Sequence, residues 1–109
     1  MLVITISNPG RPYEPLAAVI THRVSGLDVI KDMWARFSDI TGGRVRGYEK
    51  AGKSLIGDMV RELKEDASKI GADAIIGLTI QIFPIDAKGT SMYSMTAYGT
   101  AVKFSHTSS

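Results

Sequence analysis

Two stretches of the chain repeat apolar residues with the period of an amphipathic α-helix. The first runs from Asp28 to about Ile40, and its apolar positions are Val29, Ile30, Met33, Trp34, Phe37 and Ile40. The second runs from about Tyr48 to Ile70, with one stripe made of Tyr48, Ala51, Leu55, Met59, Leu63, Ala67 and Ile70. Spacings of three and four predict two helices that each bury one face. Gly42-Gly43 and Gly71 follow these stretches and are typical of residues that end a helix.

Four other stretches have the β-branched content or the alternation of β-strands. They are residues 2–6, 16–24, 74–83 and 91–104. In 74–83 the residues Ile76, Leu78, Ile80 and Ile82 fall on one face. Asp86 and Gly89 are candidate turn residues between the last two strands. Residues 7–15 hold three of the four prolines and predict an extended connector.

The last strand predicts two unlike faces. One carries Tyr93, Met95, Ala97, Gly99 and Ala101, whose small residues allow a helix to lie close. The other carries Met92, Ser94, Thr96, Tyr98, Thr100 and Val102, so it is only half polar. Helices on one side of a sheet leave the other side partly exposed, and an exposed apolar area of this kind typically marks an interface. The pattern therefore favours self-association.

Composition indicates one globular domain over residues 1–109, and the polar end of the chain predicts a flexible tail at 105–109. The chain has 44% hydrophobic and 22% charged residues, a net charge of +2 and no cysteine. So small and scattered a charge does not favour nucleic-acid binding, and the lack of cysteine excludes disulfides and thiol chemistry. No apolar run is long enough to span a membrane or to act as a secretory signal, so we expect a cytoplasmic protein.

Residues 47–54, GYEKAGKS, match the phosphate-loop pattern G-x-x-x-x-G-K-[ST]. That loop works between a buried strand and the start of a helix, where backbone N–H groups surround the phosphates. Here the motif follows a predicted helix and a glycine stop, and Tyr48, Ala51 and Leu55 already lie in phase on the second helical stripe. We therefore interpret the motif as the first turns of that helix and keep nucleotide binding only as an outside alternative.

Other candidate chemistry is sparse. His22 and His106 are the only histidines, and nothing in their spacing predicts a metal site, so we expect no metal ligand and no cofactor. Glu62, Glu65 and Asp66 are interpreted as solvated charges on the exposed side of the second helix.

One cluster surrounds the glycine turn between the predicted helices. It contains Arg36, Asp39, Gly42, Gly43, Arg44, Tyr48 and Glu49. Arginine forks of this kind can bind a carboxylate or another small anion. A structural ion-pair network that fixes the turn, or joins subunits, is the competing interpretation.

Three pieces of the chain together resemble the YbjQ-like family of small, largely uncharacterised bacterial proteins. They are Gly42-Gly43-Arg44 with Tyr48-Glu49, then Gly71-Ala72-Asp73-Ala74, then Gly99-Thr100-Ala101-Val102-Lys103. The resemblance covers roughly residues 15–103. It implies an α+β fold with a β-α-β-β two-layer unit, an antiparallel sheet and a dodecin-like topology. It also implies a homopentameric ring, in which a short N-terminal strand helps assembly, and a heavy-metal-binding label. His22-Arg23 stands where relatives often have Gly-Glu.

We therefore expect a ring-forming homo-oligomer that acts as a scaffold or as a small-ligand or metal-binding module. The alternative is an enzyme whose site forms between subunits, with Glu49 or Asp39 as acid or base and Arg44 as anion holder. The sequence shows no nucleophile system, which favours the non-enzymatic function.

Overall fold

The computed structural model describes residues 1–38, 55–87 and 90–105. In these ranges the elements are β1 (Leu2–Val3), β2 (Tyr13–Gly26), α1 (Leu27–Ser38), α2 (Leu55–Lys69), β3 (Ala74–Ala87) and β4 (Thr90–Phe104). The strands form one sheet in the order β1-β3-β4-β2. β4 pairs antiparallel with both β2 and β3, whereas β1 pairs parallel with β3. The expected antiparallel sheet is therefore a mixed one, because the N-terminal strand joins its edge.

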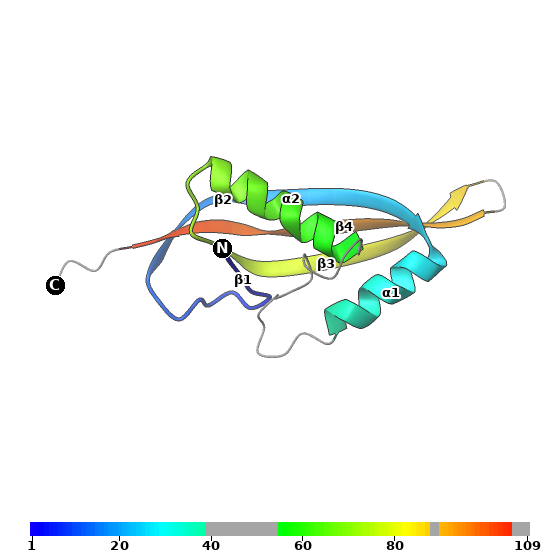
Figure 1. Cartoon of the computed structure of the whole chain (residues 1–109), viewed down its shortest axis with the longest axis horizontal. Helices are drawn as coiled ribbons and strands as arrows, with labels where there is room; N and C mark the ends of the chain where they lie inside the picture. Colours follow the sequence, from blue (N-terminus) through cyan, green and yellow to red (C-terminus); the bar gives the residue numbers. More distant parts are fainter. Residues whose placement is uncertain (39–54, 88–89, 106–109) are drawn as a thin grey trace.

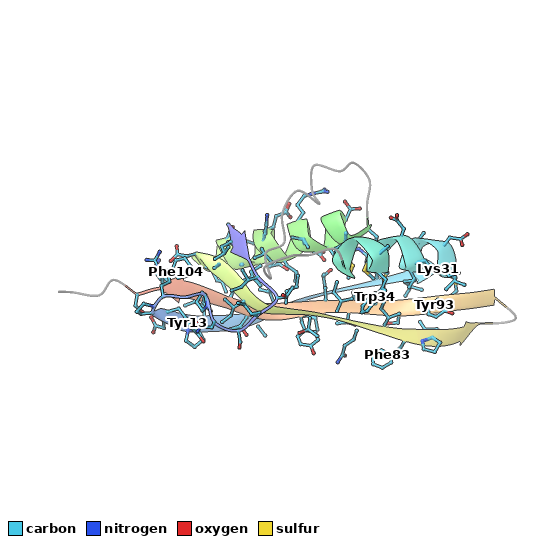
Figure 2. All side chains as sticks on the ribbon, turned by 90° about the horizontal axis from the view of Figure 1, so that it is seen from below. Tyr13, Lys31, Trp34, Phe83, Tyr93 and Phe104 are labelled. Atoms are coloured by element: carbon cyan, nitrogen blue, oxygen red, sulfur yellow. The ribbon has the colours of Figure 1, made fainter. Side chains whose placement is uncertain are left out.

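Both helices lie on the same face of the sheet (Figure 1), and the side view shows the opposite face without a helix (Figure 2). This arrangement confirms the predicted two-layer α+β fold. The Cα radius of gyration is 15.1 Å, compared with about 13 Å for a compact domain of this length. The long β3–β4 hairpin accounts for part of this elongation, since it extends past α1 in Figure 1.

The core lies between α2 and the helix-facing residues of β4 and β3. Ile56, Met59, Leu63 and Ala67 are buried along one stripe of α2. They pack with Met95, Ala97 and Ala101, which alternate along β4 as predicted. Gly71 ends α2 with a positive φ of 81°. The N–H of Ala72 bonds to the carbonyl of Ala67, and that of Gly71 to the carbonyl of Ser68, as in a Schellman motif.

Gly77 interrupts β3 and corrects the predicted face of that strand. Its φ is 65°, and the pairing of β3 with β4 shifts register between Ile76 and Thr79. Consequently Leu78 joins the main core, while Ile76 joins a second cluster with Ile4, Ala74 and Val102. Ile76 and Leu78 therefore do not share a face, because an extra residue at a bulge changes the alternation.

The N-terminal segment extends along the bulged end of β3. Beyond β1, the N–H of Leu78 bonds to the carbonyl of Ile4 at 3.0 Å, and that of Gly77 to the carbonyl of Ile6 at 2.8 Å. The chain then reaches the other edge of the sheet, where the N–H of Ser105 bonds to the carbonyl of Pro12. The segment thus links the two edges at one end of the sheet.

Three apolar residues on the predicted helical stripes are exposed rather than buried. Val29 and Trp34 on α1 are 45% and 50% exposed, and Ile70, just after α2, is 47% exposed. On α1 the buried residues are instead Ile30 and Met33. The apolar stripe of α1 is therefore wider than the strip of helix that contacts the sheet.

Candidate functional site

The predicted ligand cluster falls almost entirely outside the described residues. Arg36 belongs to the last turns of α1, and its backbone is helical as expected. Asp39, Gly42, Gly43, Arg44, Tyr48 and Glu49 lie outside the described ranges, so the ligand site at the glycine turn stays a prediction. The same holds for residues 47–54, the phosphate-loop motif, and for His106. The described part of α2 begins directly after the motif, at Leu55.

A polar cluster in the described part of the chain connects β2 to α2. Thr21 faces the helix layer and is 5% exposed. Its hydroxyl donates a hydrogen bond to Oε2 of Glu62 and accepts one from Nη1 of Arg23 at 2.8 Å. Arg23 Nη1 also lies 3.2 Å from Glu62 Oε2. The carboxylate of Glu62 thus bonds to a buried hydroxyl and to an arginine of β2, while its side chain stays 42% exposed as predicted for a solvated charge.

A second ion pair continues this cluster along α2. Arg61 Nη2 donates to Asp58 Oδ1 at 2.7 Å, and the two residues are three apart on the helix. Residues spaced by three, four and seven positions share one helix face. Asp58, Arg61, Glu62 and Glu65 therefore line, with Arg23, a surface hollow of about 380 Å³. Charged side chains of both signs surround this hollow.

The sheet face opposite the helices is uncharged, in contrast to the hollow. It carries no charged side chain over most of its length. Pairing aligns four rows of three residues across β2, β4 and β3. These rows are Ile20–Tyr98–Thr79, His22–Thr96–Gln81, Val24–Ser94–Phe83 and Gly26–Met92–Ile85. None of these twelve positions holds lysine, arginine, aspartate or glutamate. Because 22% of the residues in the chain are charged, twelve uncharged positions would occur by chance in roughly one case in twenty. We call these twelve residues the open face.

Several large apolar side chains of the open face are exposed. The exposed fraction is 62% for Ile20, 47% for Val24 and 55% for Phe83. Figure 2 shows Phe83 projecting from the sheet away from the helices. Between the apolar residues, His22 Nε2 and Ser94 Oγ form a hydrogen bond of 2.6 Å. The half-polar face predicted from the last strand is therefore confirmed, and it extends over three strands.

Metal ligation finds no support in the described ranges. Within residues 1–38, 55–87 and 90–105, no three side chains of histidine, cysteine, aspartate or glutamate are grouped so that they could hold a metal ion. No helix in these ranges is long and apolar enough to cross a membrane.

Sequence reasoning missed the Thr21–Arg23–Glu62 cluster for a specific reason. Alternation places Thr21 and Arg23 on one face of β2, but the sequence does not tell that this face meets the helices. Their partner Glu62 lies next to the buried Leu63 on α2, at the border of the apolar stripe. A sequence pattern does not tell at which border of a helix the edge strand of the sheet lies. That information comes from the tertiary structure.

The fold and its surfaces define a class: a small two-layer α+β protein with an open uncharged sheet face and a charged hollow on the helix side. A family model described as "Putative heavy-metal-binding" matches residues 1–105. The chain belongs to this YbjQ family.

Individual relatives agree with this assignment. A UPF0145 protein of Enterococcus faecalis is 34% identical over 105 residues, which cover 95% of this chain and 99% of the relative. A UPF0145 protein of Pseudomonas entomophila is 36% identical over 105 residues, which cover 94% and 98%. Among solved structures, a protein of unknown function of the DUF74 family from Pediococcus pentosaceus matches with a TM-score of 0.65 and 19% identity. The match covers 96% of this chain and 98% of that one, and it supports the fold.

Proposed function

We propose that this protein is the subunit of a self-assembling ring that serves as a scaffold for a small ligand or metal ion. The observation that carries the proposal is the open face, which exposes large apolar side chains and holds no formal charge. A sheet face that stays in contact with water normally carries polar and charged residues. A contiguous apolar area without charge is instead typical of a surface that another protein copy covers.

The edges of the sheet support a ring rather than a two-fold dimer. Among the described residues, β2 pairs with β4 alone, so its other edge keeps unpaired backbone donors and acceptors. At the opposite edge, β1 and the residues after it reach only as far as Leu78. The part of β3 from Thr79 onward therefore offers a second unpaired edge within the described ranges. Unpaired edges are templates for pairing with another chain. Pairing of two unlike edges is heterologous and generates a ring when the rotation closes.

The number of subunits and the ligand site come from the family resemblance and the glycine-turn motif. The resemblance implies five subunits with a dodecin-like arrangement. Arg36, Asp39, Gly42, Gly43, Arg44, Tyr48 and Glu49 are the residues that we propose for the ligand site, at the junction between subunits. Arg44 supplies a guanidinium for an anion, and Tyr48 and Glu49 supply further polar contacts. The family description of heavy-metal binding is the reason to include a metal ion among the candidate ligands.

Light scattering coupled to size-exclusion chromatography tests the assembly. We expect a mass near five times the subunit mass of 11.8 kDa. Val24→Lys should lower this mass, because an unpaired ammonium group buried between copies costs several kcal/mol. Val29→Lys is the matched control, since Val29 on α1 is 45% exposed and Val24 is 47% exposed. We expect the control to keep the mass of the unmodified protein.

Two results would contradict the proposal. A monomeric unmodified protein at micromolar concentration would remove the assembly itself. A Val24→Lys protein that keeps its full mass would show that the open face is not covered. Elemental analysis of protein purified without an affinity tag separately tests the metal, since a resident ion would appear at one equivalent per site.

A further inference from the structure

Each of the two arginines that line the hollow beside α2, Arg23 and Arg61, uses one terminal nitrogen for its hydrogen bonds. The other N–H groups of each guanidinium can still donate. Arg23 donates its hydrogen bonds to Thr21, His22 and Glu62 from Nη1, and Arg61 donates to Asp58 from Nη2. Within the described part of the chain, Nε and Nη2 of Arg23 and Nε and Nη1 of Arg61 therefore remain available. A guanidinium fixed by one ion pair is preorganised, so less side-chain entropy is lost when it binds an anion.

Acceptors face the same hollow. Asp58 uses Oδ1 for Arg61, and Glu62 uses Oε2 for Thr21 and Arg23, which leaves the second oxygen of each carboxylate free among the described contacts. Glu65 lines the hollow and has no ion pair or hydrogen bond within the described residues. The hollow thus combines two guanidinium groups with three carboxylates.

We propose that this hollow binds a small zwitterion, a molecule with one carboxylate and one ammonium group a few bonds apart. The free N–H groups of Arg23 and Arg61 bind the carboxylate, and Glu65 binds the ammonium group. The hollow of about 380 Å³ is open to solvent and lined by charged side chains, so it suits a small, doubly charged molecule rather than an apolar one. This site shares no residue with the proposed glycine-turn site.

The charges favour a zwitterion over a single ion. A simple anion would meet three carboxylates, and their repulsion opposes the attraction of two arginines that are already paired. A bare metal ion is disfavoured because the carboxylates of the described residues are not grouped to coordinate one. A molecule that carries both charges matches both sets of groups, and its two ends bind cooperatively because one framework joins them.

Glycine and its two halves provide the probes for the test. Acetate is glycine without the amino group, and methylammonium is glycine without the carboxylate. In an NMR titration of the ¹⁵N-labelled protein, we expect saturable shifts with glycine or 4-aminobutanoate at a Kd of about 1–10 mM. Each half-molecule should bind at least about tenfold more weakly. Shifts should concentrate at residues 21–23 and 58–65.

Variants assign the two ends of the ligand. Arg61→Gln leaves the Thr21–Glu62 contact in place and should weaken the zwitterion by about tenfold and remove the measurable shifts with acetate. Glu65→Gln should weaken the zwitterion by a similar factor without weakening acetate. Lys103→Gln, which changes an exposed lysine of β4 outside the hollow, should bind like the unmodified protein.

The proposal fails if the folded protein shows no saturable shift at these residues with either zwitterion up to about 100 mM. It also fails if methylammonium binds as tightly as glycine, since the hollow would then be an acidic patch. Loss of binding in Lys103→Gln would likewise contradict the assignment to Arg61 and Glu65. Because the titration reads the hollow directly, these outcomes do not depend on the number of subunits.

Discussion

Gly99 in β4 offers a sharp test of the packing, because its neighbours on β3 leave no room for a methyl group. A Cβ built on Gly99 would lie 2.8 Å from Cγ2 of Ile75, 3.0 Å from the carbonyl oxygen of Ile76 and 3.6 Å from Cα of Leu78. A contact of 2.8 Å is shorter than real Cβ contacts in folded proteins. The Ile75 side chain can rotate, but the Ile76 carbonyl and the Leu78 backbone belong to the bulge of β3. The bulge of β3 therefore requires a glycine at this position.

The magnitude of Gly99→Ala follows from two opposing effects. Forcing one extra methyl group into a packed core typically costs about 1–3 kcal/mol. Replacing glycine in a strand interior returns about 0.5–1 kcal/mol, because the unfolded chain loses conformational freedom. We expect a net destabilisation of about 1–2 kcal/mol. For a domain of about this length, 1 kcal/mol corresponds to a shift of about 4–8 °C in Tm, so Tm should fall by roughly 5–15 °C.

Thermal unfolding followed by circular dichroism measures this shift. All variants have to be compared at one protein concentration, because assembly makes Tm depend on concentration. Gly26→Ala is the control for an added methyl group, since Gly26 has no positive φ and a Cβ there meets nothing within 4 Å. Because Gly26 also belongs to the open face, light scattering has to show that this variant keeps the mass of the unmodified protein. We expect its Tm to stay within about 2 °C of the unmodified protein. A Gly99→Ala protein as stable as Gly26→Ala would refute the close approach of β3 to β4 at the bulge.

Two other substitutions test the core and the N-terminal segment. Leu63→Ala removes a fully buried side chain of α2 and should lower the free energy of unfolding, measured by chemical denaturation, by about 2–5 kcal/mol. Leu16→Ala is the control, since Leu16 is 38% exposed, and its loss should be well under half of that. Arg11→Gln removes a guanidinium that lies 4.1 Å from the ring centroid of Phe104. We expect the free energy of unfolding to fall by about 0.5–1 kcal/mol and proteolysis within residues 7–12 to become faster. An unchanged cleavage rate would contradict the contact.

The helices and strands were predictable because each depends on a local pattern. The period of apolar residues identified both helices, and the small residues of β4 indicated the face that packs against the rest of the core. What the pattern missed depends on contacts between elements. β1 pairs parallel with β3, and a two-residue strand has no alternation from which a partner or direction can be derived. The position of the bulge at Gly77 is likewise fixed by the neighbouring N-terminal segment.

The candidate sites likewise divide into those that a local sequence pattern predicts and those that depend on contacts between elements. The open face could be predicted from the alternation in β4, since every second residue of a strand points to the same side. The hollow beside α2 could not, because Arg23 and Glu62 come from elements 39 positions apart in the chain. The cluster at the glycine turn was predicted from the sequence alone, and it lies outside the described residues except for Arg36. Light scattering and elemental analysis of the purified protein are the measurements that test it.

β2 is the element that joins the two proposals, because its alternate residues serve opposite faces. Ile20, His22 and Val24 belong to the open face, whereas Thr21 and Arg23 face the helix layer and the hollow. A substitution on one face of a strand therefore leaves the side chains of the other face in place. Val24→Lys should thus dissociate the assembly and keep the zwitterion site, and Glu65→Gln should do the reverse. If Val24→Lys abolished both, the strand itself would be disrupted, and the mass change could no longer be assigned to the open face. The pair of measurements on this one variant decides between loss of an interface and loss of a strand.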